Sequence, residues 1–507
     1  MSVRAAPPAA GTLASRVRRG FYADSVALMR IARTLGDAPG VLQASLMIGS
    51  DANKALLARS GLLAPAARDA TPNDLIVAAR ARSAAQADAA LDEAERLLLS
   101  GAPHASALGA AGAAGLGAAL ESLPQANLAL ISVPGEFAAA EARAALERGL
   151  HVMIFSDNVP LDEEVALKRL ACERGLLAMG PDCGTALIGG VPLAFANAVP
   201  RGDIGLISAS GTGLQEVSCL LARSGQGVSH GIGVGGRDLS APVGALMTLA
   251  ALDALDRDRA TRRIILISKP PAPEIAAKLI ARAAACSKPV LLCLLGAARV
   301  KLPRGVRAAR TLEEAALGAP GAHRARSTQR VARRRGWIRG LYGGGTLAAE
   351  AQIVLMEAGL AVRSNAPVPG AEHVAAACGT AHTIIDLGDD AYTRGRPHPM
   401  IDPELRMEEL RRALRARDTA VVLLDVVIGF GAHADPAGLI ADALRATRGA
   451  HAPVLASVTG TDADPQNYTR QVQTLSAAGV TVAASNAAAA RLASRMVRAP
   501  GARQAPR

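Results

Sequence analysis

Aromatic residues are scarce in this chain of 507 residues, since Phe, Trp and Tyr together make up only 2% of it. Proteins that hold single-stranded nucleic acid stack its bases on aromatic rings, so few platforms for such binding exist here. The net charge of +12 comes nearly all from arginine, and its densest run, residues 324–335, falls in an expected linker. We therefore expect no nucleic-acid partner and relate the charge to composition or to an anionic substrate.

Long apolar runs and paired cysteines are also missing. No run reaches the roughly 20 apolar residues of a membrane span, and the N-terminus lacks the apolar core of a signal peptide. The cysteines show no CxxC spacing, which favours reduced structural thiols. We expect a cytoplasmic protein with no membrane partner and no metal site. The six cysteines are Cys172, Cys183, Cys219, Cys286, Cys293 and Cys378.

One segment that is present combines a strand, a polar turn and a helix. The apolar run 204–207 leads into a turn rich in serine, glycine and threonine, and a helix is expected to follow. Free amides and the positive end of the helix dipole would then point at one place, which suits a phosphate or a carboxylate. The alternative is an ordinary turn with a Ser or Thr helix cap. The residues concerned are Ser208, Ser210, Gly211, Thr212 and Gly213.

A second turn of this kind follows the expected strand 338–342. Gly343, Gly344, Gly345 and Thr346 precede a helix expected over residues 347–358. Two helix N-termini together with Lys269 could hold an acyl phosphate or free phosphate. Such preorganised donors stabilise a developing oxyanion by about 3–4 kcal/mol each.

Strands and helices alternate along the chain, which predicts an α/β protein with parallel-type sheets, including the sheet of a small N-terminal unit. Expected strands in that unit are 18–22, 42–48 and 74–79, with Asp24 and Asp51 as helix caps. The expected parts are a disordered tail (1–15), the N-terminal α/β unit (16–100), a Rossmann-like domain (101–200), a first flavodoxin-like domain (201–318), a linker (319–336), a second flavodoxin-like domain (337–497) and a tail (498–507).

Three motifs occur in an order that resembles the α subunit of succinyl-CoA synthetase. They are Gly180-Pro-Asp-Cys-Gly184, the turn at 208–213, and Gly231-Ile-Gly-Val-Gly-Gly-Arg-Asp238. With the segments 156–159 and 192–197 between them, the chain more closely resembles the FdrA proteins, described as acyl-CoA synthetases. Residues 337–497 resemble the C-terminal flavodoxin-like domain of the β subunit. The resemblance implies a truncated Rossmann-like CoA-binding domain followed by two flavodoxin-like domains.

The chain departs from that family in four places. The family's phosphorylated histidine lies in a turn whose counterpart here, residues 296–305, contains no histidine, and Lys269-Pro-Pro271 stands where an orienting glutamate is expected. Neither an ATP-grasp segment before Gly336 nor a GxxxxGK[ST] loop is present, so we do not expect this chain alone to activate an acid with ATP. The segment Gly109–Gly117 does not match the family's first CoA-binding turn, which leaves CoA as an open alternative.

Other polar residues follow expected strands. Arg394 and Arg396 could clamp a carboxylate, with His398 as a general acid or base, or they could belong to a solvated loop. His433 could be a base oriented by Asp435, or the two could be turn residues. Cys183 is either a thiol nucleophile or structural. Weaker candidates for substrate binding are Asp182, Gly235, Gly236, Arg237, Asp238 and Asp435. The candidate catalytic residues are Lys269, Arg394, Arg396, His398 and His433.

The resemblance implies an FdrA-type acyl-CoA synthetase-like protein that acts on an acyl-phosphate bond without a phosphohistidine. A first alternative is a subunit of an oxamate carbamoyltransferase in allantoin nitrogen catabolism, because carbamoyl phosphate needs no activation. A second is a non-catalytic scaffold subunit. We expect no tightly bound cofactor, acyl or carbamoyl phosphate as substrate, and a small anionic co-substrate. Partner subunits, a homo-oligomer, or both are expected.

Overall fold

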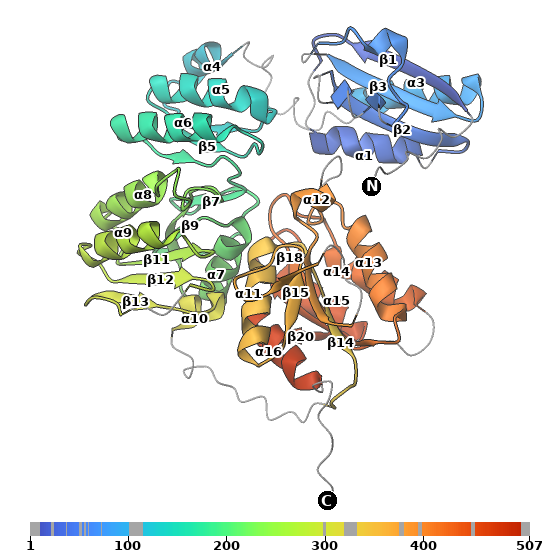
Figure 1. Cartoon of the computed structure of the whole chain (residues 1–507). Coiled ribbons are helices and arrows are strands. Elements are labelled where there is room, and N and C mark those ends of the chain that lie inside the picture. The colour runs from blue at the N-terminus through green and yellow to red at the C-terminus, as the bar shows by residue number, and fades with distance from the viewer. Residues whose placement is uncertain are drawn as a thin grey trace, which may run out of the picture. The chain divides into compact units, whose positions relative to one another are not determined.

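A computed structural model of the chain (Figure 1) falls into two compact units, one up to residue 115 and one after it. No described helix is both long and apolar enough to cross a membrane. The described residues are 11–21, 25–36, 38–49, 53–54, 57–58, 60–71, 74–100, 115–297, 301–318, 332–374, 380–393, 398–447 and 452–497.

The N-terminal unit is a three-stranded antiparallel sheet, so the parallel sheet expected there was wrong. Strands β1 and β2 run in the same direction because helix α1 connects them, but β3 inserts between them and pairs antiparallel with both. Alternation along the chain cannot reveal such an insertion. Asp24 and Asp51 lie outside the described residues. The elements are β1 (Thr12–Arg18), α1 (Ser25–Gly36), β2 (Val41–Ile48), the 3-10 turn η1 (Pro65–Ala67), β3 (Leu75–Ala81) and α3 (Ala84–Ser100).

The second unit begins with a small parallel sheet of order β4-β5-β6. Its helices α5 and α6 share a core with the sheet that follows. A short helix, α4, precedes the first strand of the small sheet. The elements are α4 (Leu116–Ser122), β4 (Leu128–Ile131), α5 (Gly135–Glu147), β5 (His151–Ile154), α6 (Leu161–Glu173) and β6 (Ala178–Met179).

A seven-stranded sheet follows, in the order β13-β12-β11-β9-β10-β7-β8. Its five parallel strands, β9 to β13, have the flavodoxin order 2-1-3-4-5. The antiparallel hairpin β7–β8 joins its edge, so the sheet takes in residues before the boundary of 201 that the sequence suggested. The strands are β7 (Thr185–Ile188), β8 (Val191–Ala194), β9 (Arg201–Ser208), β10 (Val228–Gly233), β11 (Arg263–Ser268), β12 (Val290–Leu294) and β13 (Val306–Ala308).

Helices cover both faces of this sheet, since alternate residues of β9 and β11 contribute to two different cores. One face carries α7 (Gly211–Arg223) and α10 (Leu312–Leu317). The other face carries α8 (Leu246–Arg257) and α9 (Pro273–Ala284).

The third sheet is parallel throughout, in the order β16-β15-β17-β14-β18-β19-β20. Strand β17 lies between β15 and β14, which departs from the flavodoxin order. The strands are β14 (Trp337–Tyr342), β15 (Val362–Ser364), β16 (Glu372–His373), β17 (His382–Asp386), β18 (Thr419–Val427), β19 (Val454–Thr459) and β20 (Thr481–Ala483).

The helices of this last domain also lie on both faces of its sheet. Helices α11 (Gly345–Glu357) and α16 (Asn486–Met496) cover one face. The other face carries α13 (Glu404–Arg415), α14 (Pro436–Ala446) and α15 (Tyr468–Ala477), while the short α12 (Asp390–Thr393) follows β17.

The two seven-stranded sheets share one hydrophobic core, formed where α7 and α10 pack against α11 and α16. A polar seam crosses this core. The Asn486 backbone amide donates to Glu216 Oε1 on α7 (3.2 Å), and the Asn486 side-chain amide donates to Glu350 Oε2 on α11 (2.7 Å). All three residues are at most 1% exposed. The seam therefore fixes α7 relative to α11.

Burial and the neighbouring Glu216 raise the pKa of Glu350 from its usual 4.5 to about 8. Between these pH values the folded protein keeps a proton that the unfolded chain releases, so this group makes the free energy of unfolding fall as pH rises. We expect Glu350→Gln, which mimics the protonated acid, to reduce the loss of thermal stability between pH 5 and pH 8. Thermal melts at both pH values measure the effect.

The control is Glu357→Gln, which removes an exposed carboxylate at the other end of the same helix. This control should retain the pH dependence of the unchanged protein. An equally steep loss of stability in Glu350→Gln would contradict the protonated state assigned to Glu350.

Candidate functional site

The turn between β9 and α7 places a helix N-terminus at the carboxyl end of its sheet. Ser210 caps α7, with its hydroxyl oxygen accepting from the Gly213 amide (3.0 Å). The Ser208 hydroxyl donates to the Ser210 carbonyl oxygen (2.7 Å) and accepts from the Ser210 amide (3.1 Å). The Ser208 hydroxyl therefore shapes the turn, although the sequence suggested it as a phosphate ligand.

The turn between β14 and α11 meets the first turn directly. The hydroxyl oxygens of Ser210 and Thr346 lie 2.5 Å apart. A Cβ atom built on Gly344 would lie 3.0 Å from the Thr212 methyl carbon, so only a glycine allows this approach without displacing a neighbour. The N-termini of α7 and α11 thus face each other.

Amides in the first turn of a helix have no partner within the helix. Here these amides include Gly211 and Thr212 on α7, and Gly345 and Thr346 on α11. Each N-terminus also carries roughly half a positive charge from the helix dipole. The two ends together form a place for an anion, which we call the anion seat and define by these four residues.

The protein's own carboxylate fills the part of the second turn that precedes α11. Asp425, inside β18, accepts from the Gly343 amide (2.9 Å) and the Gly344 amide (2.7 Å). Arg406 on α13 donates to the same carboxylate (2.7 Å), and Asp425 is 0% exposed. Gly343 and Gly344 were expected to bind phosphate, but their amides are engaged because this buried carboxylate needs donors.

A second carboxylate, Asp386 at the end of β17, lies against the start of α11. A Cβ atom built on Gly345 would lie 2.5 Å from Asp386 Oδ2 and 3.8 Å from Lys269 Nζ. The other oxygen, Oδ1, accepts from the Gly388 amide (2.9 Å). Burial raises the pKa of Asp386 to about 6, while the charge of Lys269 lowers it. A carboxyl group that titrates near neutral pH suits proton transfer.

Lys269 reaches this place from the first of the two flavodoxin-like domains. It follows β11, which pairs with β9 so that Ile267 lies opposite Ser208. Lys269 therefore follows the strand next to the first turn, and its exposed side chain brings Nζ near Gly345 of the second turn. The strand order changes direction between β9 and β11, and ligands of open α/β sheets bind in the crevice at such a point.

His398 also lies in this region. Its Nδ1 accepts from the Met400 amide (3.2 Å), which leaves Nε2 to carry the proton of a neutral ring. Burial lowers the pKa of His398 to about 4, so the ring is neutral at physiological pH. The His398 ring and the Asp386 carboxylate both lie next to Gly388. A Cβ atom built on that glycine would be 2.6 Å from His398 Nε2 and 3.2 Å from Asp386 Oδ1. Arg394 and Arg396, the expected clamp, lie outside the described residues.

The candidates in the loop after β10 serve a buried ion network. Asp238 accepts from the Thr248 hydroxyl (2.7 Å), the Thr248 amide (2.9 Å) and Lys168 Nζ (2.9 Å). Arg237 forms an ion pair with Glu164 (2.8 Å). These contacts join α6 to the loop, so Arg237 and Asp238, two weaker candidates for substrate binding, both have partners within the protein.

The glycines of that loop pack against the turn that contains Asp182. A Cβ atom built on Gly235 would lie 2.4 Å from the Pro181 carbonyl oxygen, and one on Gly236 would lie 3.5 Å from Asp182 Oδ2. Cys183, in the same turn, is buried, which raises the pKa of its thiol to about 12. A thiol with that pKa does not form a thiolate nucleophile at neutral pH.

His433 and Asp435 have the hydrogen bonds of turn residues, which is the second of the two alternatives that the sequence left open. The Asp435 carboxylate caps α14 by accepting from the Gly438 amide, and it also accepts from Gln471 Nε2 (3.0 Å). His433 Nδ1 accepts from the Asp435 backbone amide (3.1 Å), so this nitrogen carries no proton that it could donate to the Asp435 carboxylate. Asp435 therefore does not orient His433 as a catalytic base.

Sequence reasoning missed Asp386, Asp425, Arg406 and Glu350. Asp425 interrupts an otherwise apolar strand, and Asp386 ends one just before Gly388. A carboxylate inside an apolar strand is costly unless it is paired, and this signal could have identified both aspartates.

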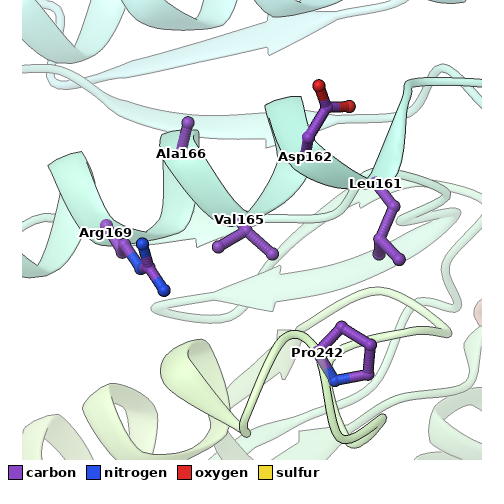
Figure 2. Close-up of a pocket in the computed structure, with 6 residues that line it drawn as sticks. All are labelled: Leu161, Asp162, Val165, Ala166, Arg169 and Pro242. Atoms are coloured by element: carbon purple, nitrogen blue, oxygen red, sulfur yellow. The ribbon is translucent and has the colours of Figure 1, made fainter.

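A surface pocket of about 570 Å³ lies between α6 and the loop after β10, and no residue of the anion seat lines it (Figure 2). Its walls are mostly apolar, with Asp162 and Arg169 at the sides. The lining residues are Leu161, Asp162, Val165, Ala166, Arg169 and Pro242.

Two family models and one full-length relative match this chain. The family model described as CoA-ligase matches residues 341–496, which contain the turn before α11, Asp386 and Asp425. The model described as AllF, heavy metal-associated domain, matches residues 11–113. The uncharacterized protein YahF of Escherichia coli (strain K12) is 42% identical over 494 residues, which cover 93% of this chain and 96% of YahF. The chain belongs to the YahF family.

The match over residues 341–496 assigns the last domain of this YahF-family chain to the CoA-ligase superfamily. The succinate–CoA ligase [ADP-forming] subunit alpha 1 of Archaeoglobus fulgidus is 28% identical over 177 residues, covering 34% of this chain and 58% of that subunit. Acetyl-coenzyme A synthetase 1 of Candidatus Korarchaeum cryptofilum aligns with a TM-score of 0.31 and 16% identity, over 73% of this chain and 82% of that one.

The N-terminal unit of this YahF-family protein does not fit a heavy-metal site. Soft metal ions prefer thiolate and imidazole ligands, but the first 150 residues contain no cysteine and a single histidine, His104. Among the described residues, no group of three His, Cys, Asp or Glu side chains could hold a metal ion.

We expect Asp425→Asn to destabilise the protein, because it leaves the Arg406 guanidinium buried without its counter-charge. Removing one partner of a buried ion pair costs about 3–5 kcal/mol. Urea denaturation measures the free energy of unfolding. The double variant Asp425→Asn, Arg406→Met removes both charges and should recover part of the loss; no loss in the single variant would contradict the pairing.

Proposed function

We propose that this YahF-family protein is an FdrA-type enzyme that acts on an acyl-phosphate bond without a phosphohistidine. The observation that carries the proposal is the meeting of the α7 and α11 N-termini, marked by the Ser210–Thr346 contact. The phosphate of a mixed anhydride would lie in the anion seat, with Lys269 beside it. Two helix dipoles and unpaired amides suit a dianionic group.

The chemistry needs no protein nucleophile, because an acyl phosphate is already activated. The acceptor attacks the carbonyl carbon, a bond to the acceptor forms, and the bond from that carbon to the phosphate oxygen breaks. The electron pair leaves with inorganic phosphate, which the anion seat holds. Asp386 takes the acceptor's proton, as its raised pKa near 6 permits. The neutral His398 ring can donate a hydrogen bond from Nε2.

Two acceptors remain candidates, and different observations support them. Membership in a CoA-ligase superfamily supports the thiol of CoA. The AllF name of the N-terminal family model supports the alternative, carbamoyl transfer to oxamate in allantoin nitrogen catabolism. The missing phosphohistidine turn agrees better with carbamoyl phosphate, which arrives activated. Partner subunits would complete either enzyme, and a ligase would need one to supply the nucleotide site.

The experiment that separates the two is ³¹P NMR on the chain purified with its co-purifying partners. One sample contains carbamoyl phosphate and oxamate, and the other contains ATP, CoA and succinate. Oxamate-dependent phosphate release establishes carbamoyl transfer, while CoA-dependent ATP consumption establishes the ligase. If neither sample shows turnover, our proposal is contradicted and the alternative of a non-catalytic scaffold subunit is favoured.

We expect Gly211→Asp to abolish phosphate release in whichever of these assays is positive, because it adds a carboxylate within the anion seat. Gly344→Asp should do the same, and it would also press on Thr212 and on Asp425. The measurement is the rate of phosphate release by ³¹P NMR.

The matched control is Pro160→Asp, which places a carboxylate at the exposed N-terminus of α6. This control should keep full activity. Full activity in Gly211→Asp would instead remove the assignment of the anion seat.

A further inference from the structure

A second, smaller pocket of about 190 Å³ lies next to the anion seat. Its walls are Lys269 and Pro270 after β11, Ala349 on α11, and the segment Ala366–Pro369 after β15. We call it the Ala349 pocket. Pockets for drug-sized ligands have volumes of about 300–1,000 Å³, so this one suits only a short molecule.

The Ala349 pocket leads toward the reacting centre. Ala349 lies four residues after Gly345, so both are on the same face of α11. Lys269 lines the pocket, and its Nζ lies 3.8 Å from the place where a Gly345 Cβ would be. Asp386 Oδ2 borders that same place. A ligand in the pocket would therefore have one end at Asp386 and the anion seat.

Hydrogen bonds hold the wall of the pocket in place. Gln352 Nε2 donates to the Ala366 carbonyl oxygen (3.2 Å), and Gln352 Oε1 accepts from the Val368 amide (3.1 Å). Asn365 exchanges two hydrogen bonds with the backbone of Asp386, at 2.9 and 2.8 Å. Two prolines stiffen the segment further. The wall is thus preorganised and tied to the residue that we assign as the base.

The charges of the lining residues indicate the chemical class of the ligand. Lys269 is cationic, and every other lining residue is Ala, Pro or Val. A small apolar chamber with one ammonium group suits a short carboxylic acid, whose carboxylate pairs with Lys269 while its few carbons contact the apolar wall.

Building on the function proposed above, we propose that the Ala349 pocket is the specificity site for the acid partner, a short carboxylate such as oxamate or a C3–C5 dicarboxylate. The pantetheine arm of CoA is too large for this volume. The pocket would hold the acid so that its reacting atom lies between Asp386 and the anion seat.

Saturation-transfer NMR on the full chain tests the pocket, with malonate, succinate and glutarate as probes and oxamate as competitor. In parallel, ³¹P line broadening of inorganic phosphate tests the anion seat, with chloride held constant. Ala366→Leu fills the pocket and should abolish acid binding while phosphate binding remains. Lys269→Met should weaken acid binding about tenfold or more, the usual effect of losing a charge-assisted hydrogen bond; Lys269 is exposed, so folding is not at risk.

The control is Ala361→Leu, an exposed position just before β15, which should bind acid and phosphate as the unchanged chain does. If phosphate binds but no short acid does, or if Ala366→Leu binds the acids normally, the pocket assignment is overturned and the anion seat stands. If acids bind and phosphate does not, the proposed function fails while the pocket stands. Binding of neither overturns both.

Discussion

The packing of α7 against α11 is the constraint on which the candidate site depends. Each helix begins at the carboxyl end of a different sheet, and neither N-terminus alone distinguishes a ligand site from an ordinary turn. Asn486 links Glu216 on α7 to Glu350 on α11 inside the shared core. Because this buried seam fixes the two helices, their first turns meet at Ser210 and Thr346.

The segment 192–197, which contributes to the family resemblance, also helps to hold this packing in place. Asn197 donates to Asp464 Oδ2 (2.7 Å) and to the Ile428 carbonyl oxygen (2.7 Å), and it accepts from Gln215 on α7. It therefore links α7 to residues that follow β18 and β19 in the second flavodoxin-like domain. A segment that carries a family resemblance can thus hold the domains together without itself contacting a ligand.

Much of the fold could be predicted from the sequence, because apolar runs and glycine turns are local signals. The strands expected at 204–207 and 338–342 lie within β9 and β14, and the turns at Ser208 and Gly343 lie at their ends. What the sequence did not show depends on residues far apart. Asp425 accepts a hydrogen bond from the Gly343 amide, 82 residues earlier in the sequence. Glu216 accepts from the Asn486 amide, 270 residues later. Strand β3 inserts between two strands that precede it in the sequence.

Charge placement at the site was the hardest part to predict. Composition shows that carboxylates are present, but only the packed structure shows that Asp425 is neutralised by Arg406, whereas Asp386 faces Lys269 with a pKa near 6. The two aspartates end or interrupt similar apolar strands, so sequence alone gives them the same appearance. Because their partners differ, Asp425 has a structural role, whereas Asp386 is the candidate for proton transfer.

A crystal structure of the chain with inorganic phosphate tests the central claim most directly. The account predicts one phosphate between α7 and α11, within hydrogen-bonding distance of the amides of Gly211, Thr212, Gly345 and Thr346, with Asp425 still paired to Arg406. Phosphate bound at another place, with these four amides left to water, would contradict it.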